Sequence, residues 1–146
     1  MPRSFTGLNR SIDLVALLEE SDIHKDSLIR VTGPSGLSAL LWLCRHGYEE
    51  VGYLRPGPGC PHEEADALIV AHTCDEAFLS RLLDSGPHVR EGGSLLLQSP
   101  LPAGGGADPI HRCLARAGYR LELCVHGERR ELHVARRLRG VARWAA

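Results

Sequence analysis

Two short segments of the chain carry cysteine and histidine side chains that could bind a metal ion. Cys60 and His62 are separated by one residue, and His72 and Cys74 repeat this spacing in the mirrored order. Two thiolates and two imidazoles form a donor set that structural zinc sites use, usually with about two to four residues between paired ligands. Because the spacing here is shorter, we predict no metal site and retain these four residues as the candidates for one.

His72 is also the candidate catalytic residue. Its imidazole would titrate near neutral pH, and it follows the apolar run 67–71, which predicts a strand whose end faces a ligand-binding edge. If the chain is an enzyme, His72 is the predicted general base. The alternative is a half-exposed histidine at a strand end.

A turn between residues 30 and 36 could bind an anion. It precedes an apolar segment that predicts a helix, and amide groups at a helix N-terminus attract phosphate and carboxylate groups. The end of this segment reads Ser38-Ala39-Leu40, without the lysine and hydroxyl of a phosphate-binding P-loop, so we expect no nucleotide hydrolysis. The candidate ligand-binding residues are Arg30, Thr32, Gly33, Ser35, Gly36, Arg55 and His72. The alternative is a tight turn with solvated arginines.

Helical and strand-like apolar patterns alternate along the chain and must position these residues. Helices are expected at 11–20, at 37–46, after Asp75 as far as 83, and from Asp108 and Pro109 to 117. Strands are expected at 28–31, 51–54, 67–71, 94–98, 120–125 and 131–135, with Gly92 and Gly93 as a turn into the fourth. The Pro- and Gly-rich segments 55–62 and 100–106 are expected to be loops.

This order of elements predicts an α/β domain of three layers, with helices on both faces of a mostly parallel sheet. The last two strands are expected to form an antiparallel hairpin at the edge of the sheet. A chain of 146 residues with 43% hydrophobic side chains can bury one core, so we expect a single domain over 1–146. It comprises an N-terminal helical segment (1–26), a core (27–138) and a tail (139–146).

Composition and charge limit the partners that we expect. The five cysteines are an odd number without regular spacing, which indicates a reducing, cytoplasmic location. Residues 1–10 have no apolar run after their positive charges, and no run in the chain is long enough to span a bilayer, so we expect neither secretion nor membrane insertion. Net charge is −1 and aromatic content is 5%, which disfavours nucleic-acid binding despite the arginines that gather after residue 128.

Three segments in the second half of the chain carry a resemblance to a known family. They are Asp66-Ala-Leu-Ile-Val-Ala-His72, Arg90-Glu-Gly-Gly-Ser-Leu-Leu-Leu97 and Leu114-Ala-Arg-Ala-Gly-Tyr119. In order and spacing they resemble the fourth strand, the glycine turn into the fifth strand, and the last helix of class I S-adenosylmethionine-dependent methyltransferases. The resemblance covers residues 28–138 and implies a Rossmann-like methyltransferase fold. The alternative is an unrelated flavodoxin-like α/β domain.

The first half departs from that family where the cofactor would bind. The family places an acidic residue and three glycines in the pattern acid-x-Gly-x-Gly-x-Gly, whereas this chain has Arg30 at the acidic position and keeps only Gly36 of the glycines. The ribose-binding carboxylate at the end of the second strand is replaced by an arginine, Arg55. Too little chain lies between Arg55 and Asp66 for the family's third strand and its helix, so we predict that this strand is missing.

These departures predict a methyltransferase-like domain that has lost catalysis and acts as a ligand-binding or protein-interaction module. Two alternatives stay open, namely an active methyltransferase with atypical contacts to S-adenosylmethionine, and a phosphate- or nucleic-acid-binding protein. We expect no bound cofactor. The missing strand would expose the edge of the strand at 51–54, so a homodimer is the predicted assembly. Cover by the helix at 11–20 is the alternative.

Overall fold

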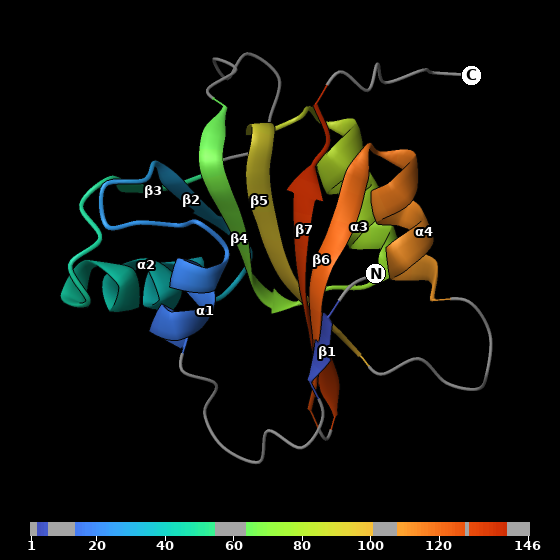
Figure 1. Cartoon of the computed structure of the whole chain (residues 1–146), viewed down its shortest axis with the longest axis horizontal. Coiled ribbons are helices and arrows are strands. Elements are labelled where there is room, and N and C mark those ends of the chain that lie inside the picture. The colour runs from blue at the N-terminus through green and yellow to red at the C-terminus, as the bar shows by residue number, and fades with distance from the viewer. Residues whose placement is uncertain (1–2, 6–13, 55–63, 101–107, 128, 140–146) are drawn as a thin grey trace.

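The protein, described here from a computed structural model, forms a three-layer α/β structure (Figure 1). The structure describes residues 3–5, 14–54, 64–100, 108–127 and 129–139. Seven strands form one sheet in the order β1-β6-β7-β5-β4-β2-β3. The predicted loops 55–62 and 100–106 lie almost entirely outside the described residues, and so does the tail after residue 139.

The sheet is mixed, with one strand running against the others. Strands β2 (Ile29–Thr32), β3 (Val51–Tyr53), β4 (Ala65–Thr73) and β5 (Val89–Pro100) are parallel, as the sequence predicts. Strand β7 (Arg130–Arg137) is antiparallel to both β5 and β6 (Tyr119–His126), which confirms the C-terminal hairpin.

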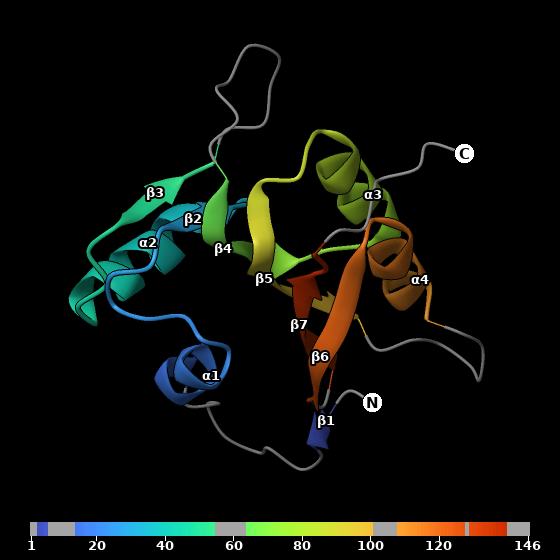
Figure 2. The ribbon, with the colours of Figure 1, turned by 45° about the horizontal axis from the view of Figure 1, so that its top comes forward.

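The four helices within the described ranges cover the two faces of the sheet (Figure 2). Helices α1 (Leu14–Glu20) and α2 (Gly36–Arg45) lie on one face, while α3 (Glu76–Asp84) and α4 (Pro109–Arg116) lie on the other. The predicted caps are present: Asp75 accepts a hydrogen bond from the Phe78 amide at 2.8 Å, and Asp108 accepts one from the Ile110 amide at 2.9 Å. In the described part of the chain, none of these helices is long and apolar enough to cross a membrane.

Strand β5 separates two apolar cores because successive side chains of a strand point to opposite faces. Leu95 and Leu97 pack with Leu79 and Leu114 under α3 and α4, whereas Leu96 packs in the core beneath α1 and α2. Each of these three leucines of β5 is at most 2% exposed. The continuous apolar run that predicted a strand is therefore explained by burial on both faces.

The hairpin is not at the edge of the sheet, and this part of the prediction is wrong. Strand β1 (Arg3–Phe5) pairs in parallel with β6, so that Arg3, Ser4 and Phe5 lie opposite Leu123, Cys124 and Val125. A strand of three residues is too short to show a periodic pattern in the sequence. Without β1, the outer edge of β6 would have unpaired backbone groups, and β1 pairs with this edge through backbone hydrogen bonds.

Gly92 and Gly93 do not form a turn before the strand, because β5 already begins at Val89. The register between β4 and β5 shifts between the pairs Ala65–Val89 and Ala67–Ser94, which places the glycines in a bulge inside the strand. Gly92 has φ +79°, a value that favours glycine, and Gly93 lies too close to Val89 and to the Asp66 carbonyl to carry a side chain.

Asp66 links the first residues of three strands next to this bulge. Its carboxylate accepts a hydrogen bond from the Leu28 amide at 2.8 Å and forms an ion pair with Arg90. Burial alone would raise the pKa of Asp66, but the hydrogen bonds from Arg90 and Leu28 and the charge of Arg90 hold this pKa below its usual value. Asp66 therefore remains a carboxylate and fixes where β2, β4 and β5 begin.

Strand β3 forms one edge of the sheet. Within the described residues, its only partner is β2, and no strand occupies the place beyond it. Most of the residues between β3 and β4 lie outside the described ranges, so the absence of the third strand stays a prediction. Helix α1 does not cover this edge: Leu17 and Leu18 are buried in the core beside α2, and both ribbon views place α1 apart from β3.

Candidate functional site

The predicted ligand-binding turn joins the end of β2 to the start of α2. Gly33 has φ +102°, and its carbonyl accepts a hydrogen bond from the Gly36 amide at 3.0 Å. The ring of His72, at the end of β4, lies directly against Gly33, so a Cβ atom at this position would collide with Nδ1 of His72. The fold therefore brings together the predicted turn and the predicted general base.

Tyr53, the last residue of β3, lies across the same turn. Its hydroxyl donates a hydrogen bond to the Gly33 carbonyl at 3.0 Å, and a Cβ atom at Gly36 would collide with its ring. The side chain thus covers the first residue of α2. The sequence prediction did not include Tyr53, since an aromatic residue at a strand end is not a chemical signal and only the pairing of β3 with β2 brings it to the turn.

The other predicted ligand-binding residues are placed differently. Arg30 lies against Gly52 of β3 and donates a hydrogen bond to the Ile29 carbonyl at 3.2 Å. Thr32 is buried, and Ser35 precedes α2 without a capping hydrogen bond from its side chain. Arg55 lies outside the described residues.

The environment of the His72 ring only partly suits a general base. Its ring contacts Phe78 edge-on at 4.6 Å between ring centroids, and its buried Nδ1 atom has no hydrogen-bond partner in the described part of the chain. A catalytic imidazole is usually oriented by a second polar group. The role of His72 as a general base stays a prediction.

Cys74 lies in the apolar core rather than at an open metal site. It is 1% exposed, and burial, followed by the negative charge of Asp75, raises the pKa of its thiol to about 12. Cys60 and His62, the other half of the predicted donor set, lie outside the described residues. The described cysteines Cys44, Cys74, Cys113 and Cys124 form no disulfide.

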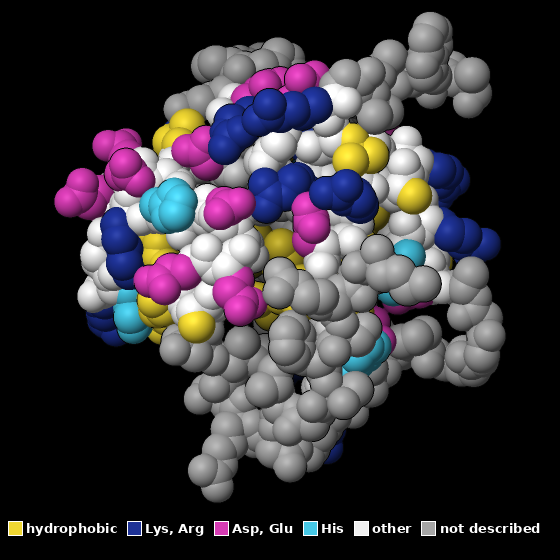
Figure 3. Space-filling view, in the orientation of Figure 1, with side chains coloured by type: hydrophobic (Ala, Val, Ile, Leu, Met, Phe, Trp, Pro, Cys, Tyr) yellow, Lys and Arg dark blue, Asp and Glu magenta, His cyan; other side chains and the backbone are white. Residues whose placement is uncertain are grey.

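Two arginines near the C-terminal end form ion pairs within the chain. Arg136 contacts Glu122 at 2.9 Å and Asp22 at 3.5 Å, and Arg137 contacts Glu64 at 3.3 Å. On the face that Figure 3 shows, the basic and acidic side chains are interspersed rather than separated into a basic patch. Paired arginines offer less charge to phosphate groups. The absence of a nucleic-acid partner stays a prediction.

No protein-family model matches the sequence, and no curated protein matches it. Similarity appears in solved structures. A ribosomal protein L11 methylase from Lactobacillus delbrueckii subsp. bulgaricus matches 86% of this chain and 77% of its own, with a TM-score of 0.57 and 17% identity. A SAM-dependent methyltransferase from Aquifex aeolicus matches 86% of this chain and 90% of its own, with a TM-score of 0.54 and 14% identity.

Human N-acetylserotonin methyltransferase, solved in complex with SAM, has a TM-score of 0.53 and 17% identity. The match covers 86% of this chain but only 53% of the human chain, so this protein spans about half its length. At these identities the likeness concerns the arrangement of the backbone. The described strand order, the C-terminal hairpin and the structural matches together show that this chain has the fold of the class I S-adenosylmethionine-dependent methyltransferases.

Proposed function

We propose that this chain is a methyltransferase-fold module that does not use S-adenosylmethionine for methyl transfer and acts by binding a ligand or a protein partner. The observation that carries this proposal is the position of Tyr53, which lies across the turn between β2 and α2. In Rossmann-like folds this turn is where the backbone approaches the ligand, and glycines make that approach possible.

The residues of the turn do not fit the cofactor in the position implied by the family resemblance. Thr32 and Pro34 stand at two of the three glycine positions, and a proline has no amide group to donate. The space beside Gly33 is filled by His72, and the space beside Gly36 is filled by Tyr53. A ligand at the backbone of this turn would have to displace both rings.

The end of β3 also lacks the group that holds the ribose in the family. The strand and the residue after it read Val51-Gly-Tyr-Leu54, without a carboxylate. Ribose hydroxyls are usually bound by an acidic side chain at this position, because two neighbouring hydroxyls can donate to one carboxylate. Two independent contacts to the cofactor are therefore absent, one at the turn and one at β3.

Calorimetric titration of the wild-type protein with S-adenosylmethionine and with S-adenosylhomocysteine tests the proposal. Each lost hydrogen bond to a charged or buried group weakens binding by about 1.5–3 kcal/mol, so two losses turn a micromolar affinity into a submillimolar one or worse. We expect little heat of binding when the cofactor is present at about 100 times the concentration of micromolar protein. The variant Arg30→Glu alone should not bind the cofactor more tightly than the wild type. Micromolar binding by the wild-type chain would refute the proposal and favour an active methyltransferase with atypical contacts.

The variant Tyr53→Ala separates the two parts of this argument. Removal of the ring uncovers Gly36 but restores neither the glycines at positions 32 and 34 nor the carboxylate at β3. We therefore expect the variant to bind S-adenosylmethionine as weakly as the wild type. Tight binding by this variant alone would mean that the turn accepts the cofactor and that Tyr53 only closes it.

We also propose that the protein forms a homodimer through the edge at β3. Leu37 and Leu41 are one helical turn apart on α2 and are 67% and 46% exposed, and Tyr53 beside them is 46% exposed. Apolar side chains next to an unpaired strand edge are commonly covered by another chain. Light scattering is expected to give twice the 15.9 kDa monomer mass at micromolar concentration, with a return toward the monomer for Leu37→Glu. A wild-type monomer at all concentrations would reject this dimer.

A further inference from the structure

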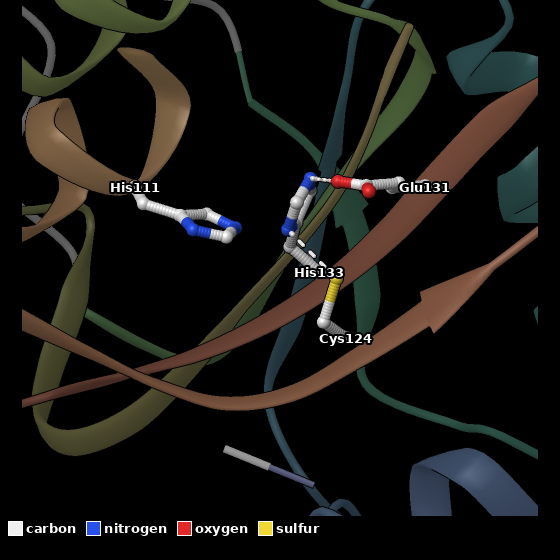
Figure 4. A group of neighbouring side chains, drawn as sticks. All are labelled: His111, Cys124, Glu131 and His133. Carbon is white, nitrogen blue, oxygen red and sulfur yellow. Dashed lines mark hydrogen bonds and ion pairs between the residues drawn. The ribbon is translucent and has the colours of Figure 1, made fainter. Parts of the chain in front are cut away.

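A second group of polar side chains lies under α4, at the end of the β6–β7 hairpin. His111 comes from the first turn of α4, Cys124 from β6, and Glu131 and His133 from β7. Each of the four offers one nitrogen, sulfur or oxygen atom, and these atoms all lie within 4.8 Å of one another. Figure 4 shows the ring of His111 reaching from the helix toward the three side chains of the hairpin.

The strand register explains why these residues meet. Cys124 and Leu97 both lie opposite His133, so all three side chains point to the face that α3 and α4 cover. Glu131 precedes His133 by two residues and therefore shares that face. The cluster thus interrupts the apolar core at the carboxyl end of β5, while the turn with Gly33 lies on the other side of β4.

The cluster is buried and several of its polar atoms lack partners. His133 is 0% exposed, Cys124 is 3% exposed and Glu131 is 5% exposed. Oε2 of Glu131 and Nε2 of His111 have no hydrogen-bond partner among the described residues, and neither has Oδ2 of the neighbouring Asp108. Buried polar atoms are normally satisfied, because leaving them unpaired is costly. Nε2 of His111 and Oδ2 of Asp108 lie 3.4 Å apart, and Oε2 of Glu131 lies 3.6 Å from Nε2 of His133. A bound cation would accept electron pairs from a carboxylate oxygen and a histidine nitrogen together.

The carboxylates of Glu131 and the neighbouring Asp108 favour a bound cation. Asp108 lies 3.4 Å from Nε2 of His111, and Glu131 lies 2.8 Å from Nδ1 of His126 and 3.6 Å from Nε2 of His133. Within the described residues, neither carboxylate forms an ion pair with a lysine or an arginine. Buried charged groups are normally paired or coordinate a metal ion, and a bound cation would balance carboxylates whose neighbours are histidines.

We propose that His111, Cys124, Glu131 and His133 bind a zinc ion. Two imidazoles, one thiolate and one carboxylate form a donor set that suits zinc, and four protein ligands leave no open position, as in structural sites. Binding of the ion replaces the S–H bond of Cys124 by a zinc–sulfur bond and releases one proton to solvent.

The distances are close to those of a bound site. Cys124 Sγ lies 3.7 Å from Nδ1 of His133, and one donor atom from each of the four residues lies within 4.8 Å of the other three. Donor atoms of a tetrahedral zinc site are about 3.3–3.8 Å apart, so the most separated pair would have to approach by about 1 Å. The required movement is within the reach of side-chain rotation.

Further polar groups are placed to support the ligands. His126 Nδ1 contacts Oε1 of Glu131 at 2.8 Å, which orients the carboxylate and leaves Oε2 toward the cluster. Ser99 Oγ lies 2.8 Å from Nε2 of His133, so that an ion on Nδ1 would leave the Nε2–H group to donate to this hydroxyl. Such contacts fix the orientation of metal ligands and raise their affinity. The ion would hold the start of α4 against the hairpin.

Zinc binding by the purified protein tests this proposal, with Cys124→Ala and Cys113→Ala as a matched pair. Cys124 of β6 and Cys113 of α4 are both buried, at 3% and 5% exposure, but only Cys124 belongs to the cluster. We expect the wild type and Cys113→Ala to bind one zinc ion per chain, and Cys124→Ala to lose affinity by about a hundredfold or more. With Co²⁺ in place of zinc, a thiolate charge-transfer band should appear in the first two proteins and not in the third.

A second variant keeps the test independent of folding. His111 has a side chain that is 40% exposed on α4, so His111→Gln removes a ligand with little effect on the core. Zinc at about 100 times its dissociation constant should raise the wild-type Tm by about 5–10 °C, and this rise should be absent in His111→Gln. No zinc binding by the wild type overturns the proposal. Equal binding by all variants, or loss only in Cys74→Ala, also overturns it, since the ion would then sit elsewhere.

Discussion

A Gly33→Ala variant is expected to lose about 3 kcal/mol of the free energy of unfolding, which is a large part of the stability of an ordinary domain. Two costs combine at this position. The residue has φ +102°, where an alanine is strained, and the new Cβ atom would collide with Nδ1 of His72. Urea unfolding followed by circular dichroism measures the loss as a shift of the midpoint without a change of slope.

The matched control for this variant is Gly47→Ala. Gly47 has φ +87°, but the nearest atom to a new Cβ is Cδ of Lys25 at 3.9 Å, so only the backbone cost applies, about 1 kcal/mol. The double variant Gly33→Ala/His72→Ala should recover the part of the loss that comes from the collision. Equal losses at Gly33 and Gly47 would show that His72 does not contact the turn.

A Gly93→Ala variant is expected to cost a similar amount, about 3 kcal/mol, for a different reason. Its Cβ would collide with Val89 and would lie 2.8 Å from the Asp66 carbonyl oxygen and 3.0 Å from that of Arg90. Carbonyl groups held in the sheet cannot move aside as a flexible side chain can. Thermal unfolding should show a fall in Tm of about 8 °C or more for a chain of this size.

Gly92→Ala serves as the comparison within the same bulge. Gly92 has φ +79°, and a Cβ there would meet only the ends of Arg139 and Arg90 at 3.3–3.4 Å. These guanidinium groups can shift, so we expect a loss of about 1 kcal/mol from backbone strain. A smaller effect at Gly93 than at Gly92 would contradict the position of the bulge.

The sequence predicts most of the fold because its strong signals are local. Asp75 and Asp108 cap their helices as expected, and the buried leucines of β5 mark a central strand. What it could not predict depends on pairing between distant segments. Strand β1 is visible only through its pairing with β6, and the bulge at Gly92 is visible only through the register of β4 against β5.

The candidate site could be predicted in part for the same reason. Gly33 and His72 were expected to share the ligand edge, and the parallel pairing of β2 with β4 brings them together. Tyr53 and the position of the Arg30 side chain depend on side-chain packing against β3. The four proposed zinc ligands come from a helix and two strands and as a set are not closely spaced in the sequence. No short sequence motif therefore predicts them.

The position of β7 between β5 and β6 has a consequence for synthesis on the ribosome. Strand β7 is the last of the described strands, yet it pairs with β5 on one side and β6 on the other. Until residues 130–137 emerge, β5 therefore has an open edge next to its run of buried leucines, and β1 has no completed hairpin to join. Open apolar edges invite pairing with other chains. The nascent protein is thus exposed to aggregation through this edge of β5 until β7 has been made.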